Sequence, residues 1–229
     1  MKRHLSFAAT VTLTLTVSVA LVSTASTAGA KLKADYRFEG SLRNSVGSAA
    51  KLTREGPGAV FLHKQVKGSR DGVWSWPEGT GLRLDGARKA VGPGKGTYTF
   101  VMLVRLDNVD GYRKLIHFKD LADDDGFYVD DGTLYPYDLD YSAVVVQPAT
   151  WYQIAVTRDS SKVVRVYVDG ARVLRVADPT GTQVLGPDNF FRFLRDDEST
   201  ATEESGGMIA RLRIYNGPLS GKRLKNLPY

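Results

Sequence analysis

The sequence predicts an all-β protein made of antiparallel strands, and three observations support this. Short segments in which apolar and polar residues alternate recur at intervals of about ten residues, separated by turn-forming Gly, Pro, Asn and Asp. No long stretch follows the helical period of about 3.6 residues. Residues 151–176 contain three such segments in succession, which predicts a meander of neighbouring strands.

This meander is the clearest predicted element. Tyr152, Ile154 and Val156 fall on one face of a strand, and residues 164–168 repeat the alternation after a polar turn. The dipeptide Asp169-Gly170 tolerates the positive backbone dihedral angles of a tight hairpin, so residues 171–176 return as a third strand. We expect one face of the meander to be buried.

The first third of the chain is less regular. Residues 33–38 alternate and predict the first strand, whereas residues 43–72 give no clear strand positions. Residues 73–84 predict two short strands around a turn at 77–79. Trp74 and Trp76 share parity and project from one face of their strand. The pair is either a platform for stacking sugar rings or part of the core, and this spacing is more typical of cores.

The remaining strands follow at regular intervals. Residues 98–106 are apolar on both faces, which predicts a central strand covered on both sides. Further strands are expected at 113–118, around a hairpin turn at Asp131-Gly132, at 189–194 and at 208–215. A chain of 229 residues without an internal repeat fits a single domain.

Several segments carry a family resemblance. They are YRFEGSL at 36–42, IAVT at 154–157 with VYVDG at 166–170, and RIYN at 213–216 followed by GPLS. This order of segments, from 36 to 224, resembles the laminin-G-like domains of the concanavalin A-like jelly-roll superfamily. The resemblance implies a two-sheet antiparallel jelly-roll sandwich over residues 31–229 that ends in a short helical turn.

Residues 1–30 predict a secretory signal peptide. Lys2 and Arg3 precede an apolar, Thr-rich core at 5–22, and small residues at 28–30 suit cleavage before Lys31. An uncleaved membrane anchor is the alternative, because about 18 apolar residues nearly span a bilayer. With cleavage, we expect a secreted, extracellular protein without membrane contact.

Composition narrows the function classes. Removing the leader, which has two basic and no acidic residues, lowers the net charge from +6 to +4, and no nucleic-acid-binding motif is present. The chain has no cysteine, which excludes a thiol nucleophile, a zinc–thiolate site and a lipoprotein anchor.

Catalysis is not expected. No strand carries the Glu-x-Asp-x-x-Glu pattern with which jelly-roll glucanases place two carboxylates in one groove, and no Gly-x-Ser-x-Gly elbow occurs. His117 with Tyr215 or Tyr135 supplies only part of a polysaccharide lyase site. We therefore expect a non-catalytic binding module, with a polysaccharide-processing enzyme on the same fold as the alternative.

The expected ligand is carbohydrate, an anionic polysaccharide or another extracellular polymer. Aromatic rings stack on sugars, and arginines bind acidic groups through charge-assisted hydrogen bonds. The candidate ligand-binding residues are Trp74, Trp76, Tyr135, Tyr137, Arg211 and Arg213. A protein-interaction or adhesion module remains a further alternative.

Calcium is the expected metal, because the resemblance implies loop carboxylates that hold it. Calcium takes six to eight oxygen ligands from flexible loops. Acidic residues cluster at 123–125 with 130–131, and at 196–198 with 203–204. The candidate ligands are Asp196, Asp197, Glu203, Glu204 and Asp125. In the alternative interpretation both clusters are solvated loops, with Arg192 and Arg195 neutralising the second.

Overall fold

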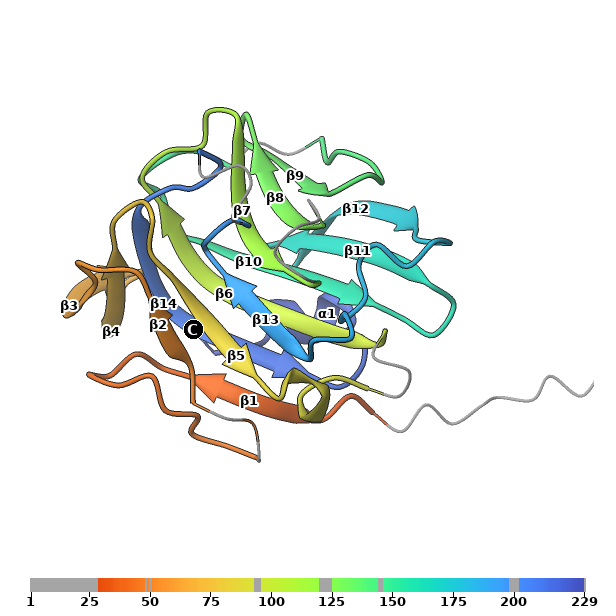
Figure 1. Ribbon diagram of the computed structural model, residues 1–229, viewed down its shortest axis with the longest axis horizontal. Helices are drawn as coiled ribbons and strands as arrows, with labels where there is room; N and C mark the ends of the chain where they lie inside the picture. The colour runs from red at the N-terminus through yellow and green to blue at the C-terminus, as the bar shows by residue number, and fades with distance from the viewer. Residues whose placement is uncertain are drawn as a thin grey trace, which may run out of the picture.

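The computed structural model describes residues 29–47, 49, 51–92, 96–119, 125–143, 146–197 and 202–228. Two antiparallel sheets are stacked face to face (Figure 1). This confirms the predicted all-β, two-sheet jelly-roll sandwich. Residues 1–28 of the predicted signal peptide lie outside the described residues, so the signal peptide stays a prediction.

The larger sheet has β14 beside its centre. Its order is β12 (Ala171–Ala177), β11 (Val163–Val168), β10 (Tyr152–Arg158), β6 (Tyr98–Leu106), β14 (Gly207–Tyr215), β4 (Ser69–Trp76) and β3 (Val60–Val66), and β1 (Leu32–Tyr36) also pairs with β14. β4 pairs with the beginning of β14 and β1 with its end. The last strand of the chain thus joins segments from the first third.

The smaller sheet packs against the larger one. Its order is β2 (Thr53–Glu55), β5 (Gly81–Asp85), β13 (Phe190–Phe193), β7 (Tyr112–His117), β8 (Gly126–Asp130) and β9 (Thr133–Pro136). A 3-10 turn, η1 (Ala87–Lys89), follows β5, and a single short helix among the described residues, α1 (Gly221–Lys225), follows β14. This helix confirms the expected helical turn.

The predicted meander is confirmed as β10, β11 and β12. Asp169 and Gly170 have φ angles of 49° and 80°, as the hairpin turn requires. Ile154 and Val156 are buried between the sheets, and Tyr152 packs partly buried beside them. The alternating face of the sequence is therefore the face that meets the second sheet.

The core between the sheets is aromatic. The ring of Phe100 on β6 contacts the rings of Phe118, Phe191 and Phe193 at centroid distances of 5.9, 4.9 and 6.0 Å. All four side chains are fully buried. Burying one such ring contributes roughly 1.5–3 kcal/mol, so this group is a main source of stability.

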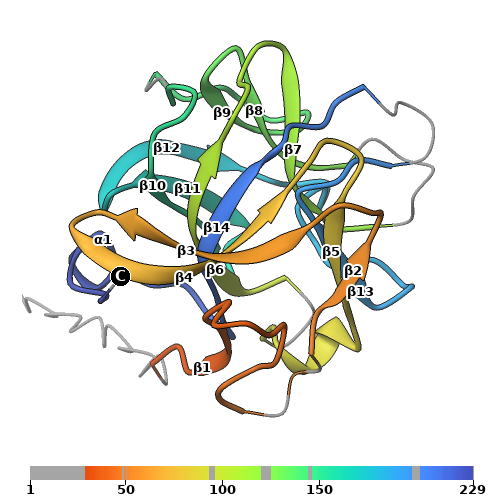
Figure 2. The same ribbon diagram turned by 90° about the vertical axis from the view of Figure 1, so that its left-hand side faces the viewer.

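The outer face of the larger sheet is also covered, which explains why β6 is apolar on both sides. Val101 packs under Leu224 of α1, and Leu103 packs under Val66 and Val73 of the β3–β4 hairpin. Figure 2 shows this hairpin crossing in front of β14 and β6. No helix of the described residues is long and apolar enough to cross a membrane.

Candidate functional site

Tyrosine rings gather at the β8–β9 end of the smaller sheet. We call them the tyrosine cluster; its members are Tyr112, Tyr128, Tyr135, Tyr137 and Tyr141. Tyr128 and Tyr135 face each other across β8 and β9, and Tyr112 comes from the neighbouring β7. The segment after β9 then lays Tyr141 on top of this group.

Tyr135 and Tyr141 form the most closely stacked pair of rings in the tyrosine cluster. Their rings are parallel within 2° and their centroids are 4.0 Å apart. The hydroxyl oxygens of Tyr112 and Tyr141 lie 3.2 Å apart, within hydrogen-bond distance. These two contacts hold the Tyr141 ring in position.

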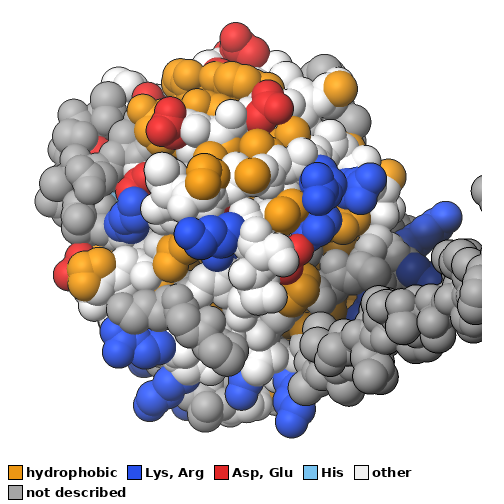
Figure 3. Space-filling model, turned by 90° about the vertical axis from the view of Figure 1, so that its right-hand side faces the viewer, with side chains coloured by type: hydrophobic (Ala, Val, Ile, Leu, Met, Phe, Trp, Pro, Cys, Tyr) orange, Lys and Arg blue, Asp and Glu red, His pale blue; other side chains and the backbone are white. Residues whose placement is uncertain are grey.

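The five tyrosines of the cluster differ in their solvent exposure. Tyr128 is fully buried, Tyr112, Tyr135 and Tyr137 are half-buried, and Tyr141 is 43% exposed. Figure 3 shows hydrophobic side chains at the top of the molecule with acidic side chains beside them, at the height where β8 and β9 lie in Figure 1. One face of an ordered aromatic ring is thus presented to solvent.

Acidic residues surround the exposed end of the cluster. The Asp138 backbone N–H donates to the Tyr135 hydroxyl at 3.0 Å, and the Tyr141 N–H donates to Asp140 Oδ1 at 2.8 Å. Burial and the neighbouring Asp131 charge raise the pKa of Asp130. The hydrogen bond with Tyr112 raises the pKa of Tyr141, so its phenol stays neutral. The rim carries acceptors for hydroxyl groups.

The structure brings together the predicted residues Tyr135 and Tyr137. Sequence reasoning missed Tyr112, Tyr128 and Tyr141. For Tyr128, the pairing of strands carried the information that sequence reasoning did not use. Tyr128 belongs to the cluster because it lies opposite Tyr135 in the β8–β9 hairpin. The turn at Asp131-Gly132 fixes that register and could have located Tyr128.

Trp74 and Trp76 belong to the core, the interpretation that their spacing favoured, and they do not form a sugar platform. The two rings stack on each other at 5.5 Å, but they are only 1% and 2% exposed. Trp76 Nε1 also donates to the buried Ser205 carbonyl oxygen at 2.8 Å. Their shared parity places both rings on one face of β4, and the structure shows that this face meets the core.

Arg211 and Arg213 are engaged within the protein. Arg211 makes two 2.7 Å hydrogen bonds to the buried carboxylate of Asp35. Arg213 lies 3.6 Å from the same carboxylate, donates to the Pro228 carbonyl oxygen and is only 4% exposed. Arg213 is therefore not a ligand-binding surface residue, and Arg211 reaches solvent only at its edge.

The segment after β13 carries the predicted calcium ligands onto the outer face of the smaller sheet. Asp196 lies 2.9 Å from the Lys114 ammonium, and neither side chain is exposed. The Arg192 guanidinium donates to the Asp196 carbonyl oxygen at 2.7 Å. Protein cations thus supply the positive charge around Asp196.

Two other candidate calcium ligands, Asp125 and Glu204, each lie beside a different basic side chain. Asp125 lies 2.5 Å from the Lys119 ammonium, and Glu204 lies 3.7 Å from Arg195. Burial raises the pKa of Glu204. Within the part of the chain that the structure describes, no three carboxylate or imidazole groups meet in a position to hold a metal. The described residues do not fit a calcium site by themselves.

Other members of the acidic segments cannot be placed. Asp123, Asp124 and Glu198 lie outside the described residues. Asp197 is buried, and the Glu203 backbone oxygen accepts the Lys114 N–H at 2.9 Å. Calcium binding by this loop therefore stays a prediction.

The partial lyase site is not assembled at the surface. Tyr215 lies on β14 of the larger sheet, and Tyr135 lies on β9 of the same sheet as His117, but His117 itself is fully buried on β7. A catalytic base must come within hydrogen-bond reach of substrate. In this arrangement His117 does not.

Residues 79–225 match the family Laminin_G_3, the concanavalin A-like lectin/glucanases superfamily. The match covers more than half of the chain and contains the strands that build the smaller sheet from β5 onward. The chain belongs to this family.

Solved structures share the fold. Domain 4 of AbnA, a GH43 extracellular arabinanase from Geobacillus stearothermophilus, solved in complex with arabinotriose, superposes with a TM-score of 0.67 at 18% identity, over 86% of this chain and 98% of that one. The binding domain of Paraclostridial Mosquitocidal Protein 1 gives 0.60 at 11%, over 85% and 51%. The botulinum neurotoxin serotype G binding domain gives 0.59 at 12%, over 85% and 50%.

The chain spans about half the length of these two toxin domains. At such identities the likeness concerns the fold alone. No curated protein matches the sequence.

Proposed function

We propose that the protein is an exported, non-catalytic module that binds neutral carbohydrate through the tyrosine cluster. The observation that carries the proposal is the Tyr141 ring, which is 43% exposed and held parallel to Tyr135. Membership of a lectin/glucanase superfamily supports it, as does the arabinotriose complex of the arabinanase domain.

The geometry suits a sugar ring in two ways. An exposed aromatic face packs against the apolar C–H face of a sugar, and the tyrosine hydroxyls supply hydrogen-bond donors beside it. The acidic rim accepts hydrogen bonds from sugar hydroxyls. Because Asp130, Asp138 and Asp140 lie around the ring, an anionic polymer is disfavoured at this surface, and we propose a neutral glycan.

The non-catalytic and exported parts rest on separate observations. The sequence lacks the paired carboxylates of a glucanase, and His117 is buried away from any substrate. The apolar leader with its small-residue cleavage site supports export.

A glycan array followed by calorimetry with the best glycan tests the proposal, with arabinotriose as the first soluble probe. Tyr141→Ala removes the exposed ring and should weaken binding roughly tenfold, the value of about 1–1.5 kcal/mol for one aromatic contact. Phe61→Ala is the matched control, because Phe61 is 38% exposed on β3 of the other sheet. Equal affinities of the two variants would contradict the tyrosine cluster as the site.

A second candidate function is protein interaction through β3. This strand ends the order of the larger sheet, and its residues Val60, Phe61 and Leu62 are 50%, 38% and 37% exposed. An edge strand with exposed apolar residues can add a strand from another protein. Protein binding that Leu62→Lys abolishes and competing sugar leaves unchanged would favour this function.

A further inference from the structure

A cavity of about 230 Å³ lies on the outer face of the larger sheet, on the side away from the core. Its lining comes from the segment after β1, from β4 and from the neighbouring strands β6 and β14: Arg37, Glu39, Asp71, Leu103, Ala210 and Arg211. Figure 2 shows the segment after β1 and the β3–β4 hairpin on the same side of the molecule, in front of β14.

One wall of the cavity has an excess of positive charge. The Asp35 carboxylate, buried behind the wall, is within 3.6 Å of the guanidinium groups of Arg37, Arg211 and Arg213. One carboxylate cannot neutralise three guanidinium groups. The Arg37 side chain is 57% exposed, and Asp35 is its one side-chain partner among the described residues. Its terminal N–H groups are therefore available to a ligand.

Two acidic residues also line the cavity. Glu39 Oε1 accepts the Gly72 N–H at 3.0 Å, which fixes that side chain. Asp71 Oδ2 is buried and has no hydrogen-bond donor among the described residues. A buried carboxylate oxygen without a donor costs free energy that a donating ligand can recover. Asp71 Oδ2 can therefore accept a hydrogen bond from a hydroxyl group of a ligand.

The apolar part of the lining is small. Leu103 of β6 and Ala210 of β14 are only 3% and 6% exposed, because they pack in one cluster with Val66 and Val73 of the β3–β4 hairpin. Their exposed edges, beside hydrogen-bond donors and acceptors, can contact the C–H groups of a ring whose hydroxyl groups face Arg37 and Asp71.

We infer that this cavity binds one neutral sugar ring, as a subsite separate from the tyrosine cluster. C–H groups of the ring contact the exposed edges of Leu103 and Ala210, and adjacent hydroxyl groups donate to Asp71 and accept from Arg37. A neutral sugar fits because the three arginines are balanced by Asp35, Glu39 and Asp71. The inference rests on the proposed carbohydrate function and adds a second place of contact.

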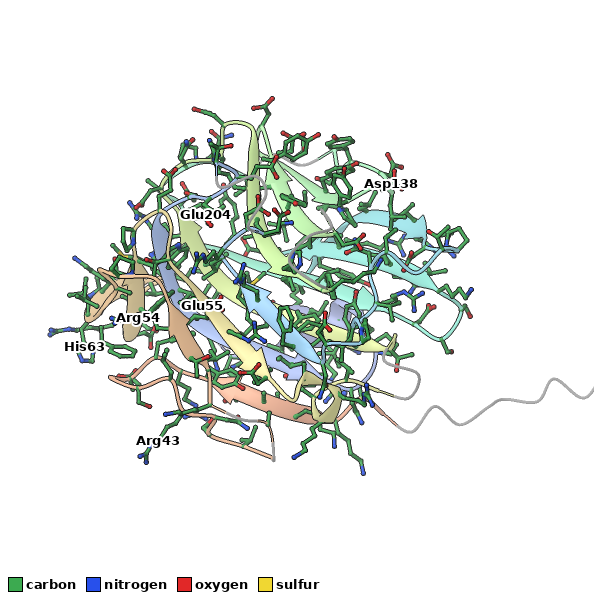
Figure 4. All side chains as sticks on the ribbon, in the orientation of Figure 1. Arg43, Arg54, Glu55, His63, Asp138 and Glu204 are labelled. Carbon is green, nitrogen blue, oxygen red and sulfur yellow. The ribbon has the colours of Figure 1, made fainter. Side chains whose placement is uncertain are left out.

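A second cavity extends the subsite. It has a volume of about 200 Å³ and shares Arg37 and Glu39 with the first, while Ser41, Arg43 and Asn44 lie further along it. The next unit of a glycan chain is placed there, with the Ser41 hydroxyl and the Arg43 guanidinium as partners. The Asn44 amide is engaged within the protein, because its oxygen accepts from the Asp35 N–H and its nitrogen donates to backbone oxygens. Arg43 is labelled near β1 in Figure 4.

Nuclear magnetic resonance titration of the purified protein with glucose, galactose and arabinose tests the inference. We expect the backbone amide signals of Gly72, Leu103 and Ala210 to shift with sugar concentration. Asp71→Ala should weaken this response about tenfold or more, since a hydrogen bond to a charged group is lost. Arg54→Ala is the control, because Arg54 is exposed on β2 of the other sheet.

The outcomes separate the two proposals. Shifts at the cavity that persist in Tyr141→Ala and weaken in Asp71→Ala support the subsite. If Tyr141→Ala abolishes all binding and Asp71→Ala binds as the unmodified protein does, the subsite is refuted and the tyrosine cluster stands. No shift at these amides with any sugar up to about 100 mM, far above the millimolar range of weak sites, also refutes the subsite.

Discussion

The Lys114 ammonium nitrogen lies 2.9 Å from a carboxylate oxygen of Asp196, and both side chains are inaccessible to solvent. Lys114 also lies over the ring of Tyr128, 4.0 Å from its centroid. Lys114 belongs to β7, whereas Asp196 belongs to the segment after β13. The pair therefore connects that segment to the sheet surface beneath it and, through Tyr128, to the tyrosine cluster.

Lys114→Met should destabilise the protein by about 3–5 kcal/mol, because it leaves the Asp196 carboxylate buried without its cation. Urea unfolding measures this loss. Lys64→Met is the control, since Lys64 is exposed on β3 and should change stability by less than about 0.5 kcal/mol.

The double variant Lys114→Met with Asp196→Leu distinguishes a lost pair from a stranded charge. It removes both charges, so its stability should exceed that of Lys114→Met alone. A double variant less stable than Lys114→Met would show that packing, rather than the uncompensated charge, governs this position.

Acid should weaken the protein through Asp35. Burial by itself raises the pKa of Asp35, but hydrogen bonds from Arg211 and the charges of Arg211 and Arg213 outweigh it, so the pKa lies below its usual 3.8. A lowered folded-state pKa adds stability that is complete above the unfolded value and is lost as the pH falls through the folded value. Asp35→Asn should therefore cost stability at neutral pH, and this cost should shrink below pH 3.8.

Unfolding free energies of the unmodified protein and Asp35→Asn, measured from neutral pH to below 3.8, check this. Asp110→Asn at an exposed loop position is the comparison and should show no such trend. A difference between Asp35→Asn and the unmodified protein that stays constant with pH would mean that the Asp35 charge is not what the arginines stabilise.

Trp76→Phe should lower stability without changing glycan affinity. The substitution removes the hydrogen bond to the Ser205 carbonyl oxygen and leaves that buried oxygen unsatisfied, at a cost of about 1–3 kcal/mol. Thermal unfolding and calorimetry on the same samples measure both quantities. Lost glycan binding at unchanged stability would restore the predicted tryptophan platform.

The sequence predicts strands well where at least one face is buried and poorly where both faces are exposed. Apolar and polar residues alternate along the β10–β12 meander because one face meets the core, so the strands can be recognised from the sequence. β3 is exposed over nearly its whole length, and its sequence VFLHKQV carries no alternation for a core to impose. Its place at the edge of the sheet depends on pairing with β4.

The positions of the candidate site residues are likewise only partly predictable from local sequence patterns. Parity places Trp74 and Trp76 on the same face, but it does not say which face meets the second sheet. The end of the chain covers Arg213, since the Pro228 carbonyl oxygen accepts its hydrogen bond, and no local pattern predicts that contact. Tyr141 reaches Tyr135 through a loop whose path depends on tertiary contacts.

If calcium binds the acidic segment as predicted, its binding should depend on Lys114. A divalent cation near Asp196 must compete with the buried ammonium, so calcium should raise the unfolding temperature of Lys114→Met more than that of the unmodified protein. Differential scanning calorimetry in calcium and in chelator measures both shifts, with magnesium as the control cation, because it prefers rigid octahedral sites. Unchanged unfolding temperatures in both proteins would contradict the calcium prediction. The predicted ligands would then be neutralised by protein cations: Lys114 for Asp196, Lys119 for Asp125 and Arg195 for Glu204.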